Sequence, residues 1–127
     1  MNNPKWLFTF GGVIALVYGI GDLFFTEFFF SIYDSKTDAT GMNLAHFLGM
    51  TNITLGLVIF ALRDLTDRVI IRKVSAGAAV GLVMGIFVAV EAVLTGGLNH
   101  LGWGIVAVYI VLAAWCGYIA VTNPSRR

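Results

Sequence analysis

The sequence predicts an all-α fold: a bundle of four transmembrane helices that run up, down, up and down, with both termini on the cytoplasmic side. Apolar residues make up 58% of the 127-residue chain and charged residues only 12%, and the mean hydropathy is +0.87. A soluble domain carries about a quarter charged residues, whereas a protein surrounded by lipid needs few. The apolar residues also gather into stretches of membrane-spanning length. We expect residues 1–127 to form a single transmembrane domain.

Four apolar stretches approach the ~20 residues that a hydrocarbon core of about 30 Å requires. They cover residues 7–25, 43–62, 74–95 and 103–122. The first stretch has no A-x-A-like cleavage site and continues past Asp22 into Phe24 and Phe25, so we expect it to be retained as a helix. Between the first two stretches we expect a connection of interfacial aromatics and a polar turn.

The basic residues outside the stretches predict the orientation. Lys36 is the one lysine or arginine on its side of the membrane. Seven lie on the other side: Lys5, Arg63, Arg68, Arg72, Lys73, Arg126 and Arg127. Because the loops are short, this bias places both termini and the 63–73 loop in the cytoplasm. Asp64 and Arg68 are four residues apart, a spacing compatible with an ion pair on a helical extension.

Small residues predict where helices touch. Close packing between membrane helices favours glycine and alanine at the contact. Gly77, Gly81 and Gly85 form a stripe on the third stretch, and we expect it to contact another helix, with one of the same chain favoured over a second copy. Gly49 and Gly56 lie seven residues apart on one face of the second stretch, which favours close backbone approach there.

Ionisable residues gather near the non-cytoplasmic side. At a rise of 1.5 Å per residue, Asp22 lies about 24 Å above Trp6, His46 about 24 Å above Leu62, and Glu91 about 25 Å above Val74. His100, in the hairpin at residues 96–102, falls just above this layer, and Asn52 shares a helix face with His46. Ionisable groups in a membrane span normally face protein or water. The layer of Asp22, His46, Asn52, Glu91 and His100 is therefore the candidate site.

Four interpretations of this layer stay open. Imidazole and carboxylate groups suit a metal such as zinc, iron or manganese, although the spacing supports a metal only weakly. Adjacent ionisable groups also suit a proton relay. A third interpretation is recognition of a small amphipathic ligand, such as a lipid or quinone headgroup, with an aromatic collar around its apolar part. In the fourth, the polar groups only bond to one another and fix the bundle.

Other classes of function find no support in the sequence. The net charge of +1 leaves no basic surplus, so we expect no nucleic-acid partner. The single cysteine, Cys116, excludes an internal disulfide or a CxxC motif. No phosphate loop, nucleophile elbow or zinc-protease helix occurs, so no catalytic residue is predicted, and the sequence identifies no particular cofactor or metal.

The layout resembles the DoxX-like small four-helix membrane proteins. The resemblance rests on four spans, a glycine-rich first helix, and the run from Asn43 to Gly49 (NLAHFLG) ahead of Gly56 and Arg63. It implies an accessory membrane subunit, because some members are associated with respiratory or thiol-redox complexes. The lone Cys116 departs from dithiol chemistry, and no functional residue is carried over from the family.

These observations favour a non-enzymatic, multi-pass protein of the cell membrane, in a bacterial or archaeal cytoplasmic membrane. We expect an accessory subunit or a binder of a small membrane-soluble ligand at the polar layer. The alternatives are a membrane-embedded metal or redox enzyme and a homo-oligomeric channel or proton pathway. The expected partners are the lipid bilayer and either further copies of the chain or a larger membrane complex.

Overall fold

The computed structural model describes residues 3–122, so Arg126 and Arg127 of the predicted cytoplasmic cluster lie outside the described residues. The described chain forms helices and no strand. They are α1 (Pro4–Phe24), α2 (Thr26–Ile32), α3 (Ala39–Ala61), the 3-10 turn η1 (Leu62–Asp64), α4 (Arg68–Leu94) and α5 (Gly102–Thr122). Four of these helices are long and apolar enough to cross a membrane. The predicted all-α four-helix fold is confirmed.

Capping residues explain why three of the helices begin before the predicted apolar stretches. The Asn3 side chain accepts a hydrogen bond from the Lys5 backbone N–H at 3.0 Å, and Asp38 caps α3 in the same way at Gly41, at 2.8 Å. Asp67 caps α4, accepting from Val69 at 2.8 Å. Such caps satisfy the free N–H groups of a first turn, so α1, α3 and α4 extend into polar sequence that a hydropathy window leaves out.

The connection between the first two spans contains a helix that the sequence did not predict. Residues 26–32 form α2, which begins one residue after the end of α1. Gly21 of α1 makes room for it: a Cβ at this position would overlap the ring of Phe29. The Thr26 hydroxyl, 5% exposed, donates to the Asp22 carbonyl at 2.6 Å. The aromatic residues expected to lie in an interfacial connection are therefore partly held against α1 by a helix.

Glycines bring α1 and α3 into backbone contact. A Cβ at Gly19 would lie 2.8 Å from the Gly49 carbonyl oxygen, and one at Gly12 would lie 3.0 Å from the Gly56 carbonyl oxygen. The two glycines on each helix are seven residues apart, so they recur on one face after two turns. The close approach expected at Gly49 and Gly56 is confirmed, and α1 and α3 form the first helix pair.

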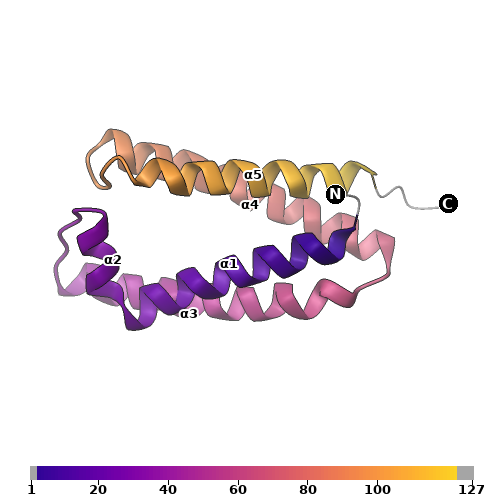
Figure 1. The fold of residues 1–127 in the computed structure, drawn as a ribbon, viewed down its shortest axis with the longest axis horizontal. Helices are drawn as coiled ribbons and strands as arrows, with labels where there is room; N and C mark the ends of the chain where they lie inside the picture. Colours follow the sequence, from indigo (N-terminus) through magenta and orange to yellow (C-terminus); the bar gives the residue numbers. More distant parts are fainter. Residues whose placement is uncertain (1–2, 123–127) are drawn as a thin grey trace.

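The second pair is α4 and α5, and the two pairs converge at one end (Figure 1). This end, where α1 begins and α5 ends, is called the terminal end, and the opposite end is called the loop end. The core cluster consists of Leu7, Phe8, Ile71, Cys116 and Ile119. The rings of Phe10 on α1 and Trp115 on α5 also meet, with centroids 6.2 Å apart.

The ribbons of the two pairs diverge toward the loop end, where α2 leans from the first pair toward the second (Figure 1). Hydrogen bonds connect the pairs again beyond α2. The Ser35 hydroxyl donates to the Gly97 carbonyl at 2.6 Å, and the Asn99 backbone N–H donates to the Tyr33 carbonyl at 3.1 Å. The pairs are thus joined by apolar packing at the terminal end and by polar loop contacts at the loop end.

Two features of the packing differ from what the sequence favoured. A Cβ at Gly77 or Gly81 would have nothing within 4 Å, so only the Gly85 end of the predicted stripe contacts a helix of this chain. Asp64 pairs with residues other than Arg68, whose spacing was compatible with an ion pair: its carboxylate lies 3.1 Å from the Lys5 ammonium and 3.3 Å from the Arg63 guanidinium. The helix ends at Asp64 and α4 begins at Arg68, so the two residues do not share a helix.

Candidate functional site

Asp22 lies in the last turn of α1, where the local backbone is firmly held. Helix α1 ends at Phe24, and the N–H of the C-cap residue Phe25 donates to the Gly21 carbonyl at 2.9 Å. The buried Thr26 hydroxyl bonds the carbonyl of Asp22 itself. The Asp22 side chain is partly buried. The backbone that carries the Asp22 carboxylate is thus held by the end of one helix and the start of the next.

The glycine contact between α1 and α3 places Asn52 opposite Asp22. A Cβ at Gly49 would lie 2.7 Å from the Leu23 nitrogen and 3.0 Å from the Asp22 carbonyl carbon. Asn52 lies one helical turn further along α3, close enough for its side chain to interact with the Asp22 carboxylate. Of the predicted site residues, the structure brings these two together.

Three tyrosines complete the arrangement. Tyr18 lies one turn before Asp22 on α1, and its side chain interacts with that of Tyr33, the C-cap residue of α2. Tyr109, from α5 in the other helix pair, is close enough to interact electrostatically with both Tyr18 and Asp22. All the members are partly buried. We call this set the Asp22 cluster: Tyr18, Asp22, Tyr33, Asn52 and Tyr109.

The position of Tyr109 depends on α4. A Cβ at Gly85 would lie 2.9 Å from the Tyr109 ring, so the glycine provides the space in which the ring packs. The phenol lies near enough to Asp22 for an electrostatic interaction. The spacing of Tyr18 and Asp22, one turn apart, was visible in the sequence, but no local signal connected Tyr33 or Tyr109 to them, because each comes from a different element.

The other predicted site residues lie outside the Asp22 cluster. His46 is partly buried on α3, and in the part of the chain that the structure describes it forms no ion pair with Asp22. Glu91 on α4 and His100 in the α4–α5 loop are exposed. Across residues 3–122 no group of three or more His, Cys, Asp or Glu side chains is placed to hold a metal ion.

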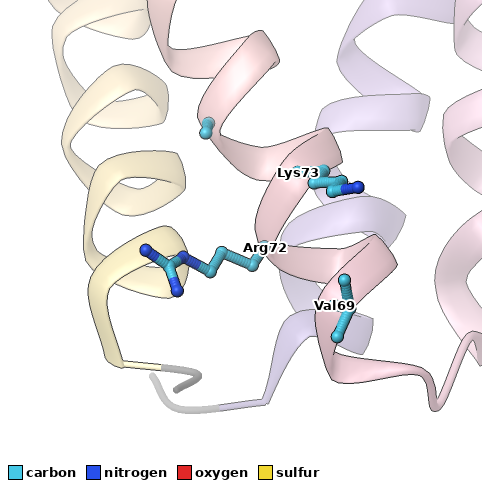
Figure 2. A pocket seen from close by; sticks show the side chains of 4 residues that line it. Val69, Arg72 and Lys73 are labelled. Carbon is cyan, nitrogen blue, oxygen red and sulfur yellow. The ribbon is translucent and has the colours of Figure 1, made fainter. Parts of the chain in front are cut away.

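A separate hollow of about 410 Å³ lies near the terminal end, lined by Val69, Arg72, Lys73 and Ala76 of α4 (Figure 2). Figure 2 shows the Arg72 side chain extending toward α5 and the Lys73 side chain pointing away from it. Because the two charged groups diverge, they do not converge on one ligand. The Asp22 cluster, where side chains from four elements meet, is the stronger candidate site.

Comparison with protein families, with curated proteins and with solved structures finds no match to this chain. The class of protein therefore rests on the fold and the composition. Four long apolar helices define a small helical membrane protein, and their number is compatible with a multi-pass arrangement.

Proposed function

We propose that this chain binds a small amphipathic molecule that reaches it through the bilayer, and that the Asp22 cluster recognises the polar part of that molecule. One observation carries the proposal: a partly buried carboxylate near the end of an apolar helix interacts with amide and phenol side chains from α1, α3 and α5. Binding sites for small molecules are mostly apolar, with a few convergent polar groups. The proposed location is a bacterial or archaeal cytoplasmic membrane, with the cluster near its outer face.

A purely structural role would need fewer groups. Asp22 and Asn52 alone would provide a polar contact between α1 and α3, and such contacts contribute only about 0.6 kcal/mol on average in membrane proteins. Tyr109 belongs to the other helix pair and interacts electrostatically with Asp22, and Tyr33, the C-cap residue of α2, interacts with Tyr18. Convergence from separate elements favours recognition of a ligand over simple attachment of two helices.

The proposal is tested by purification in a mild detergent followed by native mass spectrometry. We expect a small molecule to be retained by the wild-type chain and lost from the variants Asp22→Asn and Tyr109→Leu. Glu27→Gln, which removes an exposed carboxylate on α2 at the same end of the molecule, is the matched control and should retain it. An identical small-molecule content in all four proteins, or none in any, would contradict the proposal.

A second candidate, a subunit of a homo-oligomer or of a larger membrane complex, is supported by a different surface. Gly77, Gly81 and Glu91 fall within about 80° of arc on α4, and all three are exposed. Lipid does not require small residues or a carboxylate, whereas a neighbouring helix favours both. An accessory subunit is also what the resemblance to DoxX-like proteins implies.

Cysteine crosslinking in native membranes tests this second candidate. In a Cys116→Ala background, Gly81→Cys should form a crosslinked product larger than the single chain. Val111→Cys, on the face of α5 that is 63% exposed, is the control and should crosslink much less. Equal crosslinking at the two positions, or none at Gly81→Cys, would count against a partner on α4.

A further inference from the structure

The basic residues at the start of α4 have no acidic partner among the described residues. Arg68, Arg72 and Lys73 lie in its first two turns, and the first turn contains no acidic residue. The helix dipole favours acidic rather than basic side chains near a helix N-terminus, so these charges do not stabilise the helix. The ion pairs within residues 3–122 join Asp64 to basic residues of α1 and η1, and the Asp67 carboxylate caps α4. The positive charge of α4 is therefore able to attract an anion from outside the chain.

Arg72 and Lys73 lie at the depth of lipid phosphate groups. Residues 74–94, the rest of α4, extend over about 30 Å at 1.5 Å per residue. This length matches a hydrocarbon core of about 30 Å, so the two basic residues fall at its edge, at the terminal end of the molecule. The orientation predicted from the basic residues places that end in the cytoplasmic leaflet.

An apolar strip begins in the hollow between these two residues and continues along α4. Val69 and Ala76 line the hollow of about 410 Å³ together with Arg72 and Lys73. The α4 strip consists of exposed residues within about 60° of arc: Val69, Ala76, Val80, Val83 and Phe87. Arg72 and Lys73 fall about 50° to either side of its centre. Figure 2 shows the Arg72 side chain directed toward α5 and the Lys73 side chain away from it.

This pattern fits one class of anion best. A compact anion cannot contact two cations that point to different sides of a helix, and it has no apolar part for the α4 strip. A phospholipid with one phosphate group covers the strip but engages one cation at a time. A phospholipid with two linked phosphate groups offers an anion to each cation and apolar chains to the strip. Basic pockets on the cytoplasmic side of membrane proteins bind such headgroups.

We propose that the start of α4 binds an anionic phospholipid with two phosphate groups, through Arg72 and Lys73 on the two sides of the α4 strip. The divergence of the two side chains, which argues against a compact ligand, is what two separated phosphates require. The site lies at the opposite end of the molecule from the Asp22 cluster. It goes beyond the proposed function and does not depend on it.

Native mass spectrometry of the detergent-purified chain, titrated with single lipids, tests the proposal. Tetraoleoyl cardiolipin carries two phosphates, dioleoyl phosphatidylglycerol carries one, and dioleoyl phosphatidylcholine has no net charge. We expect saturable binding of one cardiolipin per chain, about fivefold or more tighter than that of phosphatidylglycerol, because each basic residue at a membrane surface contributes an attraction of that order. Phosphatidylcholine should show no saturable binding.

Four variants locate the site. Arg72→Gln and Lys73→Gln should each weaken cardiolipin binding about fivefold, and Ala76→Trp should weaken it by filling the hollow without a change of charge. Arg68→Gln is the matched control, because it removes the same charge from the same end of α4 but does not line the hollow. It should bind cardiolipin as the wild type does. All four positions are exposed, so we expect the variants to fold.

Three outcomes would overturn the proposal. Equal weakening in Arg68→Gln and Arg72→Gln would show a diffuse attraction to a positive surface instead of a site. Equal affinity for cardiolipin and phosphatidylglycerol would contradict the requirement for two phosphates. A dimeric chain that takes up no cardiolipin would assign the α4 strip to a second copy.

Discussion

The Asn99 side chain, in the loop between α4 and α5, donates a hydrogen bond of 3.1 Å to the carboxylate of Asp34, 65 residues earlier in the chain. The same amide group donates to the Ile32 carbonyl at 2.9 Å. Asp34 has a positive φ of 52°, a left-handed conformation that aspartate tolerates better than most residues. One asparagine thus joins the end of α2 to the second helix pair.

We expect Asn99→Ala to loosen the loop end without unfolding the chain. The loss of side-chain hydrogen bonds at an exposed site should cost about 1 kcal/mol, because net contributions of single hydrogen bonds are of that order. Double electron–electron resonance between spin labels at the exposed positions Lys36 and His100 measures the distance between the two loops. The distance distribution should broaden in Asn99→Ala and stay narrow in the control Asn43→Ala. An unchanged distribution would show that Asn99 does not hold the pairs together.

The glycines of α1 and α4 should respond differently to alanine. A Cβ at Gly19 would lie 2.7 Å from the Ile53 nitrogen, a backbone atom that moves only with its helix. Gly19→Ala should therefore destabilise the first pair by about 1–3 kcal/mol. Gly81→Ala meets nothing within 4 Å and should be neutral or stabilising by up to about 1 kcal/mol, since alanine favours the helix. Unfolding in mixed micelles measures the change in stability of each variant. Equal changes for Gly19→Ala and Gly81→Ala would contradict the close contact at Gly19 and the open space at Gly81.

Two buried hydroxyls offer a matched comparison. Ser75 is 0% exposed, and its oxygen has no hydrogen-bond partner among the described residues. Thr26 is 5% exposed and bonds the Asp22 carbonyl. We expect Ser75→Ala to stabilise the chain by about 1 kcal/mol and Thr26→Val to destabilise it by a similar amount. Thermal unfolding in detergent gives both values. A loss of stability in Ser75→Ala would mean that the hydroxyl has a favourable role.

The orientation predicted from the basic residues is open to chemical labelling. Single cysteines replace Lys36 and Thr66, both exposed in loops at opposite ends of the molecule, in a Cys116→Ala background. We expect a membrane-impermeant maleimide to label Lys36→Cys in intact cells and Thr66→Cys only after permeabilisation. The reverse pattern would refute the predicted topology, and labelling of both positions in intact cells would indicate two orientations.

The helices could be predicted because hydropathy and length are properties of consecutive residues. The last span shows this best: predicted at 103–122, it is observed as Gly102–Thr122. The apolar stretch predicts a start at residue 74, whereas α4 begins at Arg68. A hydropathy pattern leaves out the cap and the polar first turn, because these residues are not apolar. Helix α2 was missed because it is short, and its place depends on the contact between Phe29 and Gly21.

The candidate site was predictable only in part. Asp22 and Asn52 stood out as polar residues in apolar stretches, and glycine spacing on the second stretch indicated the face on which Asn52 meets α1. Tyr109 could not be found in this way, because its approach to Asp22 depends on how α5 is rotated against α4. Glu91 and His100 shared the predicted depth, but depth does not fix the direction of a side chain.

The sequence by itself determined that this chain is helical and has four stretches long and apolar enough to cross a membrane, because hydropathy and length add up along consecutive residues. Only the tertiary structure decided which glycines touch, which half of the α4 stripe stays uncovered, and which polar groups surround Asp22. These features depend on how each helix is rotated and on the distance between helices, which matters to within a few tenths of an ångström. Such distances are set by residues far apart in the sequence.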